Sequence, residues 1–452
     1  MSMRTLTTVA VPGQAAAPLP PLATTGEPQV PGQRRPAADR ESSVRSYHAM
    51  FPRTFSRGAG TLLHDAQGRR YLDFFCGAGA MNLGHNPADI KRALVEHLEG
   101  EGLLHALDLE TPAREGLRNA LDDLLVARGM EFSYLSPGPT GANAVEAALK
   151  IARRATGRTG VIAFTGAFHG MSLGALSVTS NRQVRAASGA ALPDVTFFPF
   201  PDPRHPWTEH SLAHLEHVLD DTHSGVALPA AVIVESVQAE GGVNPAPLAW
   251  LRGLVALCRA RGVLVISDDI QVGCSRTGSF FSFEAAGVTA DIVVLAKALS
   301  GVGLPLSLVL FRRELDVLAP GEHNGTFRGN QLAFVAAARA LPLLADPALG
   351  EQVRLKGDRL AGLLRDQVAA AGIDVPVRSR GLILGVDLVD AGASTASRVS
   401  AECFRRGLLV EATGRGDTVV KLLPPLTVEH EQLDEAADVF GRALRAVLAS
   451  PS

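Results

Sequence analysis

The sequence has few cysteines, no long apolar run and no excess of basic residues, and each of these absences excludes a class of protein. Only 4 of its 452 residues are cysteines, and they lie too far apart for a disulfide framework or a Cys-x-x-Cys zinc site. No apolar run reaches the roughly 18 residues of a transmembrane helix. The formal net charge of −3 gives no basic excess for nucleic acid or an anionic membrane. We therefore expect a cytoplasmic protein that binds no metal, no nucleic acid and no membrane.

The composition of most of the chain suits a globular protein, whereas its beginning does not. Hydrophobic residues are 46% and charged residues 20% of the chain, enough for a sizeable core, and 452 residues suit two joined domains. Residues 1–42 are instead rich in proline and alanine and contain no aromatic residue. This composition predicts a disordered tail. A transit peptide and a polyproline segment that docks on a partner enzyme remain open alternatives.

From residue 43 onward, short apolar runs alternate with helical patterns. The runs are continuous rather than alternating, which is typical of strands covered by helices on both faces. They are Gly160–Thr165, Ala230–Glu235, Gly262–Ser267, Ile292–Ala296 and Ser307–Phe311. We predict an α/β fold whose mostly parallel central sheet has helices on both faces.

The two ends of the globular part have a different pattern. A hairpin is predicted over Thr61–Phe75, and beyond residue 330 helical stretches surround one further strand, Leu382–Leu388. We therefore predict a large domain over 100–330 and a smaller α+β domain built from 43–99 and 331–448.

Two carboxylates end the predicted strand Gly262–Ser267. Asp268 and Asp269 follow it directly, and the carboxyl ends of strands in an α/β sheet are where ligands bind. A desolvated carboxylate needs a cation or hydrogen-bond donors. An aspartate pair that merely caps the next segment is the alternative.

A lysine ends the next predicted strand, Ile292–Ala296. Lys297 lies between two alanines, and burial there would lower the pKa of its amine, as a Schiff-base lysine requires. The alternative is a surface lysine whose stem covers apolar atoms.

A loop of small residues leads into a predicted helix at 136–150. Its backbone N–H groups and the helix dipole would point at one place, which suits a phosphate group. The loop is neither a Walker A sequence nor a Gly-x-Gly-x-x-Gly fingerprint. An ordinary turn before a helix has the same composition.

Together with the turn Phe168-His169-Gly170, these features resemble the class III, or omega, pyridoxal-phosphate aminotransferases of fold type I. The resemblance covers residues 43–448 and is specific because four motifs occur in the family's order and spacing. Within the family, the chain is most similar to the diaminobutyrate–2-oxoglutarate aminotransferases. The segments that carry this similarity are 138–141, 166–171, 269–271 and 322–330.

The resemblance implies pyridoxal 5'-phosphate as cofactor and a role for each matching residue. Lys297 would bind the cofactor covalently and move a proton during catalysis, and Asp268 would keep the pyridine nitrogen protonated. Glu235 and Glu240 match the family's active-site glutamates, one of which gates the substrate carboxylate; Glu235 would lie at the cofactor and Glu240 at the substrate. The remaining cofactor-binding positions are Thr140, Gly141 and Ala142 for the phosphate, Phe168 and His169 at the ring, Gln271 near the phenolic oxygen, and Thr326 from a neighbouring subunit.

Three positions depart from the usual family pattern. Ser275 replaces a glycine, which alters the turn if a positive φ is needed there. Met171 and Lys421 stand where many omega-aminotransferases have arginines, and both changes favour the diaminobutyrate branch. We therefore expect Lys421 to bind the substrate carboxylate; an ordinary surface lysine is the alternative.

The implied reaction exchanges the terminal amine of L-2,4-diaminobutyrate with glutamate and 2-oxoglutarate, in the biosynthetic direction with aspartate 4-semialdehyde as acceptor. Alternatives are an aminotransferase for ornithine, acetylornithine or 4-aminobutyrate, and a pyridoxal-phosphate aminomutase. A non-catalytic scaffold would have lost Lys297 or Asp268, and both are present. The resemblance also implies a homodimer or larger homo-oligomer with shared active sites.

Overall fold

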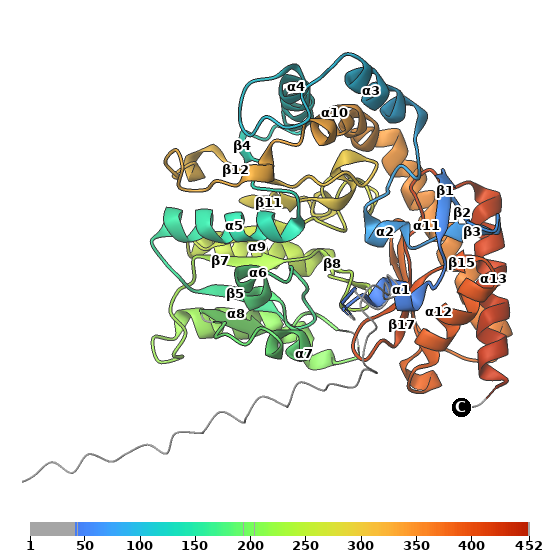
Figure 1. Cartoon of the computed structure of the whole chain (residues 1–452). Helices are drawn as coiled ribbons and strands as arrows, with labels where there is room; N and C mark the ends of the chain where they lie inside the picture. Colours follow the sequence, from blue (N-terminus) through green and yellow to red (C-terminus); the bar gives the residue numbers. More distant parts are fainter. Residues whose placement is uncertain (1–40, 43, 193, 203, 451–452) are drawn as a thin grey trace, which may run out of the picture. The chain divides into compact units, whose positions relative to one another are not determined.

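The computed structural model describes residues 41–42, 44–192, 194–202 and 204–450 (Figure 1). The chain divides into two compact units, 1–49 and 50–452. Helix α1 (Ser46–Met50) begins in the first unit, and every other helix and strand belongs to the second. Of the predicted disordered tail, all but residues 41–42 lies outside the described residues, so that prediction stays untested.

A seven-stranded sheet organises the second unit, in the order β4-β12-β11-β10-β7-β5-β6. The described pairings are parallel except on both sides of β12, which is antiparallel to β11 and β4. The prediction of a mostly parallel sheet is confirmed, and two short strands, β4 and β6, join the five predicted ones. The strands are β4 (Phe132–Leu135), β5 (Val161–Phe164), β6 (Val195–Phe198), β7 (Ala231–Val234), β10 (Leu264–Asp268), β11 (Ile292–Leu295) and β12 (Leu308–Arg312).

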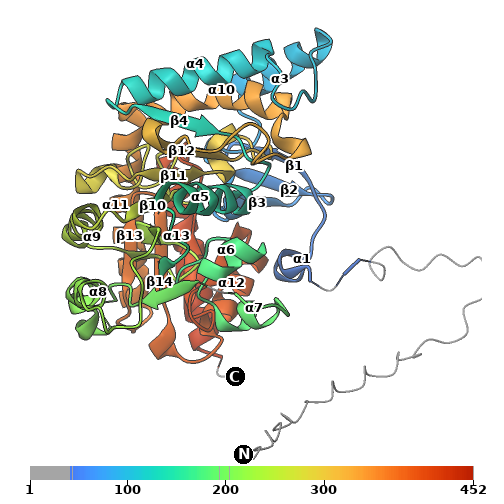
Figure 2. The same ribbon diagram turned by 90° about the vertical axis from the view of Figure 1, so that its left-hand side faces the viewer.

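Helices cover both faces of this sheet because successive strand residues point to opposite sides. Ile233 and Ile266 belong to a core cluster with α5 (Gly141–Thr156), whereas Val232 and Val265 belong to the cluster of α9 (Leu248–Ala260). Figure 2 shows α8 (Ser211–Asp220) and α9 on one side of the strands and α5 and α6 (Leu173–Val178) on the other. The continuous apolar runs in the sequence follow from burial on both faces.

Two smaller four-stranded sheets contain the segments from both ends of the second unit. One has the order β1-β2-β3-β15 and the other β13-β14-β17-β16. Leu408 and Leu409 in β15 pair in parallel with Leu72 and Asp73 in β3, which joins sequence-distant segments, coloured blue and red in Figure 1. This pairing suits a small domain built from both ends, whose boundaries stay a prediction. The strands are β1 (Phe55–Ala59), β2 (Leu62–Asp65), β3 (Arg70–Asp73), β13 (Val377–Arg380), β14 (Ile383–Asp387), β15 (Leu408–Leu409), β16 (Glu411–Thr413) and β17 (Val419–Leu422).

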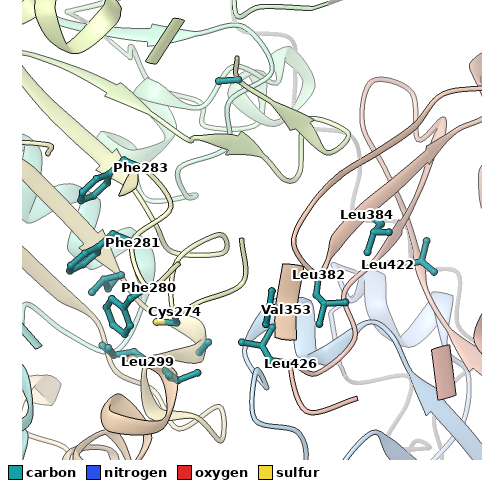
Figure 3. Packing of buried hydrophobic residues seen from close by; sticks show 14 of the residues in the cluster. Cys274, Phe280, Phe281, Phe283, Leu299, Val353, Leu382, Leu384, Leu422 and Leu426 are labelled. Atoms are coloured by element: carbon teal, nitrogen blue, oxygen red, sulfur yellow. The ribbon is translucent and has the colours of Figure 1, made fainter. Parts of the chain in front are cut away.

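One buried cluster connects the large sheet with the C-terminal segment. Figure 3 shows Phe281 and Leu299, which lie in segments that follow the sheet strands β10 and β11, and Leu382 and Leu426 from the C-terminal segment, all members of this cluster. The longer helices that complete the unit are α3 (Ala88–Glu99), α4 (Pro112–Val126), α10 (Gln331–Ala345), α11 (Pro347–Ala370), α12 (Thr395–Arg405) and α13 (His430–Leu448). In the described part of the chain no single helix has the length and apolarity to cross a membrane; α10 and α11 meet that criterion only as a pair bent by 68°.

Candidate active site

The two aspartates at the end of β10 point in opposite directions. Asp268 Oδ2 lies 2.6 Å from His169 Nδ1, in a fully buried contact. Asp269 faces the other side, where its carboxylate accepts hydrogen bonds from the hydroxyl groups of Ser267 and Ser282 and from the Ser282 N–H. The alternation of a β-strand therefore separates the roles of these neighbours. Asp268 faces the candidate site, and Asp269 ties the strand to the loop that contains Ser282.

The surroundings of Asp269 lead to a prediction about stability. Burial raises the pKa of Asp269 to about 6 from its usual 3.8. Because the folded state binds this proton more tightly than the unfolded state, its contribution is full below about pH 4 and is lost as the pH rises through about 6. In Asp269→Asn the amide still accepts from the Ser282 N–H, and both serine hydroxyls can turn to accept from its NH2 group. Thermal unfolding should show the variant gaining stability relative to wild type between pH 4 and 7, by about 2 kcal/mol.

A difference that stays constant across this pH range would contradict the assignment of the raised pKa to Asp269. Because Asp269 faces away from the candidate site, catalytic activity should fall by less than about tenfold.

The turn that contains Phe168 and His169 is fixed by two buried acids. Burial opposes protonation of His169, but the hydrogen bond and charge of Asp268 raise its pKa above the usual value. Glu235 accepts hydrogen bonds from the backbone N–H groups of Phe168 and Ala239, at 3.0 and 3.3 Å, and burial raises the pKa of Glu235 to about 7. The ring of Phe168 itself is partly exposed. In the structure His169 contacts Asp268, and Glu235 holds the backbone of the aromatic turn; the predicted contacts of both residues with the cofactor stay predictions.

The start of α5 lies against both of these elements. Thr140 caps the helix by accepting from the Asn143 N–H. A Cβ atom on Gly141 would come within 2.8 Å of the Ile270 side chain, and one on Gly170 within 2.9 Å of Ala142 Cβ. Only glycine permits these approaches, which bring the helix N-terminus against the segment after Asp268 and the turn after His169. The helix start, the aspartate and the aromatic turn therefore form one site, and the N-terminus presents the N–H groups and dipole that favour an anion.

Lys297 begins the short 3-10 helix that follows β11, in a left-handed conformation with φ of 49°. Backbone strain of this kind in a non-glycine residue is concentrated at functional sites. Burial lowers the pKa of the Lys297 amine, although the charge of Glu240 opposes that shift. None of the described residues forms a hydrogen bond or ion pair with its amine, which is therefore available for chemistry.

A buried charge cluster, Glu240, Gln271, Glu411, Thr413 and Lys421, lies beside Lys297. Lys421 is fully buried and places Nζ 2.7 Å from Glu240 Oε1, 2.9 Å from Glu411 Oε1 and 3.1 Å from Gln271 Oε1. Burial opposes ionisation of Glu240, but the charges of Lys421 and Lys297 lower its pKa to about 2. Burial likewise opposes the charge of Lys421, yet its two carboxylate partners raise its pKa. The alternative of a surface lysine at position 421 is wrong.

The other two sequence departures, Ser275 and Met171, have different outcomes. Ser275 adopts the positive φ of 65° that the turn needs, and its hydroxyl donates to the carbonyl of Leu344. Met171 is 56% exposed, so its side chain makes no buried part of the site in this chain. Thr326 is also exposed, in the 3-10 helix η6 (Thr326–Arg328), and its predicted role in a neighbouring subunit stays a prediction.

Sequence reasoning missed two members of the charge cluster, Glu411 and Thr413, which lie in strand β16. The Thr413 hydroxyl lies within hydrogen-bond distance of the carbonyl and the carboxylate of Glu240. A usable signal existed for Glu411, because a carboxylate directly after the apolar run Leu408–Val410 is unusual in a short buried strand. The sequence did not place it opposite Lys421.

These residues fit pyridoxal phosphate. The helix N-terminus suits its phosphate, the Asp268 carboxylate with its histidine partner suits a protonated ring nitrogen, and the unpaired Lys297 amine suits its aldehyde. Gly141 and Gly170 leave no Cβ between these groups. The role of each residue stays a prediction, but the chemistry of these residues suits the phosphate, the ring nitrogen and the aldehyde of this cofactor.

The chain resembles known proteins over nearly all of the second unit. The family model for class-III aminotransferases matches residues 43–444. A diaminobutyrate–2-oxoglutarate transaminase of Nocardia farcinica is 49% identical over 409 residues, which are 90% of this chain and 93% of that protein. The ornithine aminotransferase of Toxoplasma gondii superposes with a TM-score of 0.79 at 29% identity, covering 91% of this chain and 94% of that one. A PLP-bound amine transaminase from an uncultivated Pseudomonas species gives 0.76 at 27% identity, covering 93% and 98%.

Proposed function

Since this chain belongs to the class-III aminotransferases and is a PLP-dependent transaminase, we propose that it exchanges the terminal amine of L-2,4-diaminobutyrate with 2-oxoglutarate. In the biosynthetic direction, glutamate would aminate aspartate 4-semialdehyde. The observation that supports this most is the buried Lys421–Glu240 ion pair beside Lys297. The lysine of this pair supplies the cation for a substrate carboxylate. Many relatives would use the two-pronged guanidinium of an arginine for this purpose.

The chemistry at the reacting carbon divides between the bound cofactor and two residues. Pyridoxal phosphate supplies an electron sink for the carbon that loses a proton. Asp268 would hold a proton on the ring nitrogen through its negative charge, and the buried His169 fixes that carboxylate. Lys297 would take the proton from the terminal carbon of the substrate and deliver it to C4′ of the cofactor, because burial lowers the pKa of its amine.

Substrate binding would exchange partners within the charge cluster. Glu240 is the member that has solvent access, since 30% of its side chain is exposed, whereas the Lys421 side chain is fully enclosed. A substrate carboxylate that displaces Glu240 from Lys421 therefore leaves the lysine in place, and Glu240 keeps Gln271 and Thr413 as neighbours. This exchange would let one site accept the carboxylates of both diaminobutyrate and glutamate.

Removal of the lysine should weaken binding of both substrates. We expect Lys421→Ala to raise the KM for diaminobutyrate and for glutamate at least about tenfold, a loss of roughly 1.4 kcal/mol or more. The cofactor should remain bound, because Lys421 contacts side chains of the cluster and not the helix N-terminus. Steady-state kinetics with each substrate varied in turn measure this effect. Unaltered KM values for both would show that the carboxylate binds elsewhere.

A panel of amine donors with 2-oxoglutarate tests the proposed substrate. Diaminobutyrate should give the highest kcat/KM, ahead of ornithine, acetylornithine and 4-aminobutyrate. Preference for any of these three would contradict the proposed substrate, but the enzyme would still be an omega-aminotransferase. Isomerisation of a single substrate without 2-oxoglutarate would instead indicate an aminomutase.

We propose that the enzyme acts as a homodimer or larger homo-oligomer in the cytoplasm. Four large apolar side chains, Leu103, Leu104, Leu109 and Phe327, are more than half exposed. The segments that carry them lie side by side, since His105 bridges to Asn330 and its ring contacts Phe327. Such an apolar patch next to Thr326 supports a subunit contact that places this threonine in a neighbouring site. Analytical ultracentrifugation would test it; a monomer at micromolar concentration would contradict it.

A further inference from the structure

Glu411 is held in a fixed position opposite Lys421. The two residues are direct cross-strand partners in the antiparallel pair β16–β17. Glu411 is 4% exposed, and its Oε1 lies 2.9 Å from Lys421 Nζ. Among the described residues, the ammonium of Lys421 is the one group that can donate to this oxygen. A buried carboxylate that depends on a single, shared ammonium has acceptor capacity left over, so it needs an explanation.

The cluster contains more acceptor capacity than donors. Glu240 already has contacts with Lys421, Gln271 and Thr413. Glu411 shares only the ammonium of Lys421, although a carboxylate has about four sites that accept hydrogen bonds. Burial and the negative charge of Glu240 raise the pKa of Glu411 despite the attraction of Lys421. One further cationic donor would therefore satisfy the cluster.

A further donor would enter the cluster at Glu240, whose side chain is 30% exposed, since the side chains of Lys421 and Glu411 are 0% and 6% exposed. The charges of Glu240, Lys421 and Glu411 all act on the Lys297 amine, so the cluster and this lysine belong to the same buried region. Lys421 and Glu411 present opposite charges 2.9 Å apart. An α-amino acid carries its ammonium and carboxylate groups on a single carbon. Its carboxylate would therefore face Lys421 while its ammonium faces Glu411.

We propose that Glu411 binds the α-ammonium group of the substrate beside the α-carboxylate held by Lys421, and that it thereby selects zwitterionic diamino acids over simple amino acids with a terminal amine. The inference rests on the proposed function. It assigns a substrate-binding role to Glu411 and a chemical class to the substrate: an α-amino acid whose second amine reacts. Glutamate does not need Glu411, because its α-amine is the reacting group and no other ammonium remains.

Two amines that differ in one group provide the test. L-2,4-diaminobutyrate and 4-aminobutyrate differ only in the α-ammonium group, so their comparison isolates its contribution. The half-reactions of the wild-type holoenzyme and of Glu411→Gln are followed by cofactor absorbance with each of these amines and with glutamate. We expect Glu411→Gln to reduce the ratio of the second-order rate constants for diaminobutyrate and 4-aminobutyrate at least tenfold. The loss should come mainly from a higher half-saturating concentration of diaminobutyrate. The rate constants with glutamate should fall by a smaller factor than those with diaminobutyrate, because with glutamate only the Glu411–Lys421 ion pair is lost.

The glutamate half-reaction also reports whether the variant is folded. Glu411→Asp keeps the charge and should restore part of the preference. As a matched control, Glu435→Gln removes an exposed carboxylate that pairs with Arg70 and should change no half-reaction. An unchanged preference in Glu411→Gln, or an equal loss with diaminobutyrate and glutamate, would overturn the proposal. Should the wild type prefer ornithine, the proposed function fails, and ornithine against 5-aminopentanoate tests Glu411 by the same comparison.

Discussion

Asp268→Asn should lower kcat by about three orders of magnitude or more, a barrier increase of about 4 kcal/mol. The neutral amide cannot stabilise a protonated ring nitrogen in a site of low dielectric constant. The change also removes the charge that raises the pKa of His169, so that pKa should fall. The carboxylate and amide have nearly the same size, and the effect is therefore electrostatic rather than steric. Steady-state kinetics and the pH dependence of the cofactor absorbance measure it.

The neighbouring residue gives the control for this prediction. Asp269→Asn makes the same chemical change one residue away, on the opposite face of β10, where Ser267 and Ser282 bind the side chain. Its kcat should fall by less than about tenfold. The reverse order of the two effects would show that Asp269 rather than Asp268 faces the cofactor.

Lys297→Ala should lose transamination altogether and still bind pyridoxal phosphate. The helix N-terminus at Gly141 and the carboxylate of Asp268 do not depend on the lysine amine, so they continue to hold the phosphate and the ring. In the wild type, borohydride should bleach the visible absorbance, and the label should remain on the peptide that contains Lys297 after digestion. In the variant, borohydride should attach no cofactor to the chain.

Two results separate the catalytic role of Lys297 from a structural one. The unfolding temperature of Lys297→Ala should stay close to that of wild type, because no described residue pairs with the lysine amine. Lys297→Gly serves as a comparison, since glycine adopts the left-handed backbone conformation at this position without strain. A label on another lysine together with an active Lys297→Ala variant would contradict the assignment.

The sequence was informative where local chemistry is unusual in its context. The apolar runs predicted five strands of the large sheet because burial on both faces leaves a continuous pattern. The short strands Phe132–Leu135 and Val195–Phe198 are the two edge strands of the sheet, and neither is fully buried along its length. The missed strands therefore lack the signal that revealed the others.

Within the site, the sequence predicted the residues at strand and helix ends but not their partners. Asp268, Lys297 and the loop before Gly141 stand out as charges or small residues at element boundaries. The contact of His169 with Asp268 joins residues 99 positions apart, and that of Lys421 with Glu240 joins residues 181 apart. Such contacts are products of the tertiary fold. Glu411 is the clearest example, because only the pairing of β16 with β17 places it opposite Lys421.

The measurement that tests the proposed reaction most directly is identification of its product. The purified enzyme, loaded with pyridoxal phosphate, is incubated with 15N-labelled glutamate and aspartate 4-semialdehyde, and the amino acids formed are analysed by mass spectrometry. We predict L-2,4-diaminobutyrate with the label on the terminal nitrogen, and an equal amount of 2-oxoglutarate. Failure to form labelled diaminobutyrate, in an enzyme that transfers the amine of glutamate to another terminal aldehyde, would contradict the proposed function.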